Sequence, residues 1–407
     1  MKILHTSDWH LGKKLGHYSR LEEQINVLDE ICTIADEHAA DVVVIAGDLF
    51  DTYNPPNEAV DLFYSTVKRL SREGKRPVFA IAGNHDSPDR IQTPDPLARE
   101  CGIIFIGNPQ VKVVPFSLES GLRLSITDNG FLEIMLPDSK VPLRILHTPY
   151  ANEFRLKTYL NAPDKDQQLR DLLAETWRHT AEKYCDTAGV NILVSHLFFM
   201  KRGQENLDEP EDEKPILHVG GAQAIYTENI PEQLQYVALG HLHRRQIIDE
   251  SPCPVVYCGS PLGYSFAESN QEKFVLLTDI EPGNKARIQK ITLTRGKKLL
   301  RFRAGSIEEA VAWLKENEHT LVELTIVSDN YLTATDRKTL HNAHDGIIGI
   351  IPEIKNTASL VANENAVDLS KSIDALFTDY FFREKGQQPS QRIMDLFNEI
   401  KAGEGEE

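Results

Sequence analysis

Short apolar runs recur along the chain, and each has the length of one β-strand. They cover residues 3–6, 42–46, 78–82, 191–195, 236–239 and 255–258. Several are uninterrupted and rich in Val and Ile, which is typical of strands buried on both faces. Segments with apolar residues at helical spacing separate the first three runs. This alternation predicts an α/β domain built around a layered central sheet.

The first predicted helix follows Ser19-x-x-Glu22, which has the spacing of a capping box. Its apolar positions are Leu21, Ile25, Leu28, Cys32 and Ala35. A second helix, at about residues 57–72, follows Pro55-Pro56 and carries more apolar surface than one face needs. That helix has a stripe of Val60, Phe63, Val67 and Leu70, with Leu62 and Tyr64 lying off it.

The middle of the chain changes its periodicity twice. Residues 111–147 contain short alternating runs separated by Gly, Asp and Pro, which predict hairpins. A polar amphipathic helix is predicted at about residues 164–184. Residues 1–280 are therefore expected to form one α/β domain.

A smaller α+β domain is predicted for residues 281–352. It combines helices at about 306–317 and 333–344 with strand runs at 321–327 and 347–351. Residues 353–369 are polar and acidic without a period, as expected of a linker.

A helix-loop-helix is predicted for residues 370–402, with two apolar stripes that are too wide to bury each other. The stripes are Ile373, Leu376, Phe377, Tyr380 and Phe381, and Ile393, Leu396, Phe397 and Ile400.

Composition narrows the class of protein. The chain has 407 residues, 41% hydrophobic and 26% charged, which is ordinary for a soluble globular protein of two or three domains. No run is long enough to span a bilayer and no export signal is visible, so the cytoplasm is expected. The five cysteines form no CxxC pair, which favours buried thiols. A net charge of −17 argues that any nucleic-acid contact is local.

Polar residues capable of chemistry follow the apolar runs. They occur as Asp8-x-His10, Gly47-Asp48-x-x-Asp51, Gly83-Asn84-His85-Asp86, His196 and Gly240-His241-x-His243. Loops beyond the carboxyl ends of strands are where α/β folds place their sites. Each motif alone has a structural explanation as a turn or a core histidine. Their repetition at strand end after strand end favours one shared site.

The donor types predict a metal centre. Asp, Asn and His without thiolate suit Mn or Fe and allow Zn. Two metals about 3.5–4 Å apart, sharing one carboxylate, can clamp a phosphate during in-line attack by water. Seven ligands drawn from these motifs would suit such a pair of metals.

In this order, the motifs resemble the calcineurin-like metallophosphoesterase superfamily. The strings ILHTSDWHLGKKL, AGDLFDTYNPP, AGNHDSPDR, ALGHLHRRQ and YCGSPLGYSF resemble its SbcD family of nuclease subunits over about the first 280 residues. The resemblance implies an αββα phosphoesterase domain, a capping domain at 281–352 and a helix-loop-helix at 370–402. It also implies a 3′–5′ exonuclease on double strands and an endonuclease on single strands and hairpins, active in DNA repair, recombination and replication.

The resemblance also assigns roles to residues. It places Asp8, His10 and His243 on one metal and Asn84, His196 and His241 on the other, with Asp48 bridging and manganese as the expected ion. His85 would face the scissile phosphate, and Asp51 would orient His85 by hydrogen bonding. Asp51 has an alternative role in capping the loop before Pro55. Asp86 is interpreted as a turn residue, Trp9 as a packing anchor and His5 as core.

Basic residues near the motifs are candidates for DNA-backbone contacts, although each alone is also explained as a solvated surface residue. They are Lys13, Lys14, Arg20, Arg90, Arg244 and Arg245, with Lys297 and Lys298 in the small domain. The basic stretch at 295–303 either helps the small domain to steer DNA or protects an edge strand from pairing.

Partners are expected because the chain has no P-loop string of its own. The resemblance implies that the helix-loop-helix docks on the coiled coil of an SbcC-type ATPase, whereas docking back on the body is the alternative. The helix at 57–72 is expected to form a homodimer, giving a two-plus-two heterotetramer. Rival functions are a metallophosphoesterase for small-molecule phosphodiesters or phosphoproteins, and a DNA-binding scaffold with an inert site.

Overall fold

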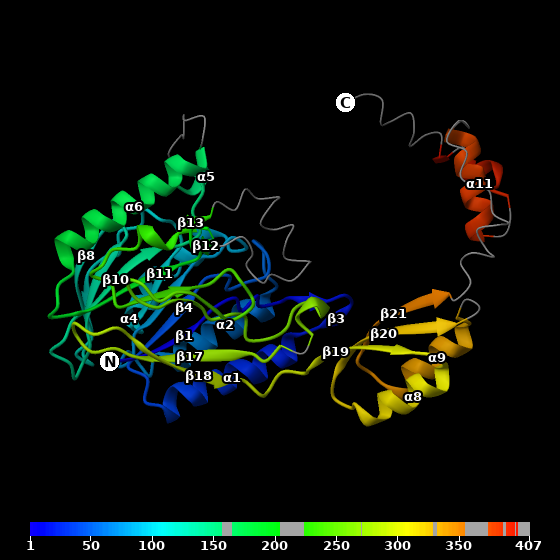
Figure 1. Cartoon of the computed structure of the whole chain (residues 1–407), viewed down its shortest axis with the longest axis horizontal. Helices are drawn as coiled ribbons and strands as arrows, with labels where there is room; N and C mark the ends of the chain where they lie inside the picture. Colours follow the sequence, from blue (N-terminus) through cyan, green and yellow to red (C-terminus); the bar gives the residue numbers. More distant parts are fainter. Residues whose placement is uncertain are drawn as a thin grey trace. The chain divides into compact units, whose positions relative to one another are not determined.

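Two β-sheets packed face to face form the body of the protein (Figure 1). The computed structural model describes residues 1–156, 165–203, 224–269, 271–328, 332–354, 373–385, 388–394 and 396–397. The first sheet has the order β18-β17-β1-β4-β5-β6, and the second β15-β16-β14-β11-β10-β9-β8-β7.

The first sheet contains β1 (Lys2–Thr6), β4 (Val42–Ala46), β5 (Val78–Ile81), β6 (Ile103–Ile106), β17 (Phe274–Asp279) and β18 (Arg287–Thr292). The second contains β7 (Phe116–Ser117), β8 (Arg123–Asp128), β9 (Phe131–Met135), β10 (Leu143–Thr148), β11 (Val190–Ser195), β14 (Tyr236–Leu239), β15 (Gln246–Asp249) and β16 (Val255–Tyr257). Short elements are β2 (Lys14–Leu15), β3 (Tyr18–Ser19), β12 (Phe199–Met200), β13 (Ile225–Tyr226), α3 (Pro88–Gln92), α4 (Asp95–Glu100), α5 (Glu153–Leu156), η1 (Thr227–Asn229) and η2 (Phe266–Glu268).

Helices cover the outer faces of both sheets. α1 (Leu21–Glu37) and α2 (Asn57–Leu70) share a buried cluster with the first sheet, and α6 (Lys165–Tyr184) shares another with the second. A third cluster, which includes Val44 and Ile192, fills the space between the sheets. The predicted αββα layering is therefore confirmed, since the uninterrupted apolar strands have a buried layer on each face.

Three details of the sequence interpretation were wrong. The N-cap of α1 is Arg20, and Ser19 lies in β3, so no capping box forms. Ile25 belongs to the predicted apolar stripe but is 49% exposed. Finally, β18 pairs with β17 inside the first sheet, so this sheet extends past residue 280 and the small unit begins near β19.

A three-stranded sheet with two helices follows β18. It consists of β19 (Leu299–Ala304), α8 (Ile307–Glu316), β20 (Leu321–Ser328), α9 (Ala334–Ala343) and β21 (Ile347–Ile354), in the sheet order β19-β20-β21. Ser306 caps α8 by accepting a hydrogen bond from the Glu309 N–H. Leu299 and Leu321 pack with Phe266 and Leu15 of the body.

Residues 327–334 and 352–407 belong to a second compact unit. Its described part contains α11 (Ile373–Lys385), where Phe377 stacks on Phe397 with ring centroids 4.0 Å apart. Tyr380 is still 62% exposed and Leu396 57% exposed, so the stripes do not bury each other. Most of the predicted linker, residues 355–369, and Ile400 lie outside the described residues. No described helix is both long and apolar enough to cross a membrane.

Candidate metal centre

The candidate ligands meet where strands of the two sheets end. β1, β4 and β5 run parallel, and Asp8, His10, Asp48 and Asn84 follow their carboxyl ends. β11 and β14 also run parallel, and His196, His241 and His243 follow them. Parallel strands finish at one edge of a sheet, so both sheets deliver their ligands to the same end of the sandwich.

Asp8, His10 and His243 form the first group of ligand atoms. One atom from each side chain lies within 4.8 Å of the others. His10 Nε2 is only 3.0 Å from His243 Nε2. Two imidazole nitrogens at this distance share at most one proton, so a cation between them satisfies both lone pairs.

The second group forms around Asn84. Its Oδ1 atom is 3.0 Å from His196 Nε2 and 3.1 Å from His241 Nδ1. Asp48 lies between the groups, because its Oδ2 atom is 3.4 Å from His196 Nε2 and 3.5 Å from His10 Nε2. One carboxylate oxygen therefore faces one imidazole of each group.

These distances fit two divalent cations. Ligands about 2.1 Å from an ion, at right angles to each other, are separated by about 3 Å. The donors are nitrogen and oxygen without sulfur, which suits manganese, iron or zinc. Asp8, His10, Asp48 and His196 are at most 2% exposed, and buried ionised carboxylates require a compensating positive charge.

The backbone is strained where it carries these ligands. The φ angles are 53° at Asp8, 44° at His10, 48° at Asp48 and 113° at His241. A positive φ in a residue other than glycine costs about 1–3 kcal/mol and is typical of functional sites. These backbone conformations direct the ligand side chains toward one another, and the rest of the fold offsets the cost.

Two motif glycines make room for the ligands. A Cβ atom at Gly83 would lie 2.0 Å from Asp48 Oδ1, and one at Gly47 would lie 2.2 Å from His196 Nδ1. Both distances are far below van der Waals contact. The glycines in the Gly-Asp and Gly-Asn-His-Asp strings are therefore required by the ligands that pack against them.

Electrostatics favour positive charge at the centre. Burial lowers the pKa of His10 well below its usual value and that of His241 to about 3. Burial alone would lower the pKa of His196 too, but the carboxylates of Asp48 and Asp8 raise it to about 9. Burial raises the pKa of Asp8 to about 6. Without a cation, a proton on His196 therefore supplies the charge that the carboxylates need.

His85 lies beside the first group, and its ring centroid is 4.9 Å from that of His10. Its backbone N–H donates to Asp48 Oδ1, and its Nδ1 atom is 2.8 Å from the backbone oxygen of Asp51. The predicted hydrogen bond from Asp51 thus exists, but the main chain makes it. The Asp51 carboxylate accepts from Lys13 Nζ at 2.7 Å, and the Asp51 backbone oxygen is the group that orients His85.

Asp86 has a larger role than the turn residue that was expected. It is fully buried, and its carboxylate accepts the N–H groups of Gly83, Leu49 and Phe50 at 2.8–3.0 Å. Three backbone donors tie the loop after β5 to the loop after β4. Trp9 and His5 are buried packing residues, as predicted.

An ion pair between the half-buried Lys273 and the buried Glu268 lies behind His243, and no sequence motif marks it. Lys273 Nζ contacts the carboxylate of Glu268 and lies 3.0 Å from the backbone oxygen of His243. Glu268 Oε1 is 3.7 Å from His243 Nδ1. Although burial by itself raises the pKa of Glu268, Lys273 holds it at about 2. Glu268 therefore stays anionic behind a ligand, which fixes and polarises the imidazole.

The candidate DNA contacts differ in exposure. Arg20 is excluded, because it is fully buried and its Nε and Nη2 atoms both bond to the Glu23 carboxylate at 2.9 Å. Lys13 is paired with Asp51, and Lys297 Nζ donates to the Tyr18 hydroxyl at 2.7 Å. Arg245 is half-buried. The exposed candidates are Lys14, Arg90, Arg244 and Lys298.

Comparisons with known proteins identify the family of this chain. Residues 1–245 match the model of the calcineurin-like phosphoesterase family. The SbcD subunit of the SbcCD nuclease of Bacillus subtilis is 34% identical over 416 residues, covering 100% of this chain and 99% of that protein. Its counterpart from Rhodobacter capsulatus is 30% identical and covers 75% and 72%. This chain aligns with 99% of a solved dimetal phosphatase from Danio rerio, over 72% of its own length, at 12% identity and with a TM-score of 0.39.

Proposed function

The chain belongs to the SbcD family of nuclease subunits and carries its calcineurin-like phosphoesterase domain, and on this basis we propose that it is a DNA nuclease. It is a hydrolase of phosphoester bonds. The proposed substrates are duplex ends, cut from 3′ to 5′, and single strands and hairpins, cut internally. The observation that carries the proposal is the position of Asp48 between two groups of three ligands.

We propose manganese for both ions, held by the seven ligands as grouped above. When bound, such a pair supplies positive charge to the phosphate oxygens and lowers the pKa of the attacking water. The chain contributes His85 beside that centre. Because a carbonyl oxygen only accepts, the Asp51 contact keeps the proton on Nδ1 of His85. Nε2 is then the atom that, in the imidazolium form of the ring, gives its proton to the leaving oxygen.

The test is degradation of linear duplex DNA with manganese by the wild type and by His85→Gln, with the bound metal measured for both. We expect the variant to lose at least about 100-fold in rate while it keeps both ions. His179→Gln, an exposed histidine on α6, is the control and should cleave normally. Undiminished cleavage by His85→Gln would remove His85 from the mechanism. Hydrolysis of a chromogenic phosphodiester without DNA cleavage by the wild type would favour a small-molecule substrate instead.

The helix-loop-helix supports a proposal about a partner. Tyr380 and Leu396 remain exposed although Phe377 and Phe397 stack. We propose that this apolar surface docks on the coiled coil of an SbcC-type ATPase, which would supply any ATP dependence of the activity. The expected cytoplasmic location stays a prediction.

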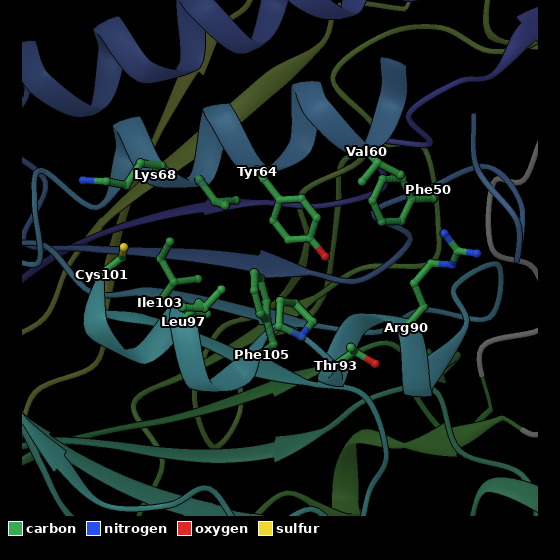
Figure 2. Close-up of a pocket in the computed structure, with 13 residues that line it drawn as sticks. Phe50, Val60, Tyr64, Lys68, Arg90, Thr93, Leu97, Cys101, Ile103 and Phe105 are labelled. Atoms are coloured by element: carbon green, nitrogen blue, oxygen red, sulfur yellow. The ribbon is translucent and has the colours of Figure 1, made fainter. Parts of the chain in front are cut away.

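The surface beside α2 supports a proposed homodimer, which with the ATPase gives a two-plus-two assembly. A cavity of about 700 Å³ opens between α2 and α4 (Figure 2). Val60 and Tyr64 of α2 are half-buried at this cavity, and Leu97 of α4 is 78% exposed. We propose that a second copy covers Leu97. Equilibrium sedimentation should show a dimer that Leu97→Asp disrupts, and a wild-type monomer at high concentration would contradict it.

A further inference from the structure

A buried arginine on α5 forms hydrogen bonds to the backbone of the loop that carries Asn84 and His85. Arg155 is 4% exposed, and its Nη1 atom donates to the backbone oxygen of Gly83 at 2.8 Å. Its Nη2 atom lies 2.9 Å from the backbone oxygen of Asp86 and 3.4 Å from that of Asn84. One guanidinium thus holds three carbonyl oxygens of a single four-residue loop.

The contacts of Arg155 and Asp86 are complementary. Asp86 accepts backbone N–H groups, whereas Arg155 donates to backbone oxygens, so a carboxylate and a guanidinium hold opposite polar groups of the same loop. Only arginine offers a planar fork of five N–H donors that can span several carbonyls at once. A lysine would place its charge there without spanning them.

The segment around Arg155 is itself anchored to the site. The Tyr150 N–H donates to the Ala82 oxygen at the end of β5, and the Arg155 N–H donates to Asn152 Oδ1. The guanidinium carbon lies 5.0 Å from the centroid of the Tyr150 ring, and Nη2 is 3.1 Å from the Tyr53 hydroxyl. The acceptors described for the Arg155 side chain are carbonyls and a phenol, none of them charged. Arg155 therefore ties the chain after β10 to the chain after β5.

We propose that Arg155 is a positioning residue for phosphoester hydrolysis, a role that rests on the proposed function. By fixing the backbone of the loop, it sets Asn84 Oδ1 against His196 and His241, and it sets His85 beside His10. Misplacement of reacting groups by about 1 Å costs on the order of 100-fold in rate. Loss of the Arg155 guanidinium should therefore weaken binding of the ion at Asn84 and slow the proton transfer by His85.

The experiment compares Arg155→Met and Arg155→Lys with Arg144→Met. Arg144 is a matched control because it is also buried, on β10, but pairs with Glu133 and Asp186 instead of the site. Manganese binding is measured by calorimetry and by the spin-coupled signal of an ion pair in electron paramagnetic resonance. kcat and KM are measured on duplex DNA, with and without added methylguanidinium.

We expect Arg155→Met to bind one ion normally and the other about 10–100-fold more weakly, with loss of the coupled signal. kcat should fall about 100-fold with KM changed much less, and methylguanidinium should restore part of it. Arg155→Lys should show the same defect in milder form, while Arg144→Met should lose only thermal stability.

Normal binding of both ions in a folded Arg155→Met, or an equal metal defect in Arg144→Met, would overturn the proposal. So would an unfolded Arg155→Met beside a folded Arg155→Lys that binds both ions normally. A wild type that binds two ions but cleaves no DNA would refute the proposed function alone, because the metal readout still tests Arg155.

Discussion

Replacing His147 with leucine should stabilise the protein, and should do so more strongly in acid. His147 lies in β10, is 2% exposed, and has its ring centroid 5.8 Å from that of Phe79 in the core between the sheets. Neither ring nitrogen has a hydrogen-bond partner among the described residues. A buried polar atom without a partner costs about 1–3 kcal/mol, which leucine would avoid at any pH.

The additional effect in acid follows from proton linkage. Burial lowers the pKa of His147 from 6.5 to about 3, so the unfolded chain binds a proton that the folded protein excludes. The free energy of unfolding is therefore unaffected by this proton above pH 6.5, and it decreases as the pH falls from 6.5 toward 3. At about 1.4 kcal/mol per pH unit, the wild type loses roughly 2 kcal/mol by pH 5 and roughly 4 kcal/mol by pH 3 through this group.

The assay is urea unfolding followed by tryptophan fluorescence at pH 7.5 and 5.0, in the presence of a chelator. The stability difference between His147→Leu and the wild type should grow by roughly 2 kcal/mol between these conditions. His179→Leu removes an exposed imidazole and should leave the pH dependence unchanged. An equal loss of stability by the wild type and His147→Leu between pH 7.5 and 5.0 would show that His147 does not cause the additional loss in acid.

Three further predictions concern the site and its partner. Gly83→Ala should abolish calorimetric binding of at least one ion, because the new methyl group would lie 2.0 Å from Asp48 Oδ1; normal binding would contradict the geometry. Glu268→Gln should weaken manganese binding about 10–100-fold, because the carboxylate behind the His243 ligand loses its charge; an unchanged affinity would show that this support is dispensable. Tyr380→Asp should reduce co-purification with an SbcC-type ATPase while DNA cleavage by the isolated chain is retained; intact co-purification would place the docking surface elsewhere.

The sequence alone determined the layers and the types of side chain at the strand ends. Continuous apolar runs such as Val42–Ala46 require a buried layer on each face, and the strand ends that follow are where an α/β fold exposes polar groups. The periodicity therefore predicted an α/β domain with a layered sheet. The motifs after the strands, through their resemblance to a known family, supplied the αββα architecture and the candidate ligands before any geometry was known.

The tertiary structure decided what each of the other polar residues touches. Arg20 was predicted to be a surface residue that contacts DNA, yet it is buried and pairs with Glu23. The hydrogen bond between Asp51 and His85 is made by the backbone oxygen of Asp51. Arg155 left no signal in the sequence, because the carbonyls it holds are about 70 residues away. Every residue has a backbone oxygen, so no particular residue type in the sequence marks the acceptors of the Arg155 side chain. Periodicity reports burial, which is a local property, whereas hydrogen bonding to the backbone of a distant loop exists only once the sheets have assembled.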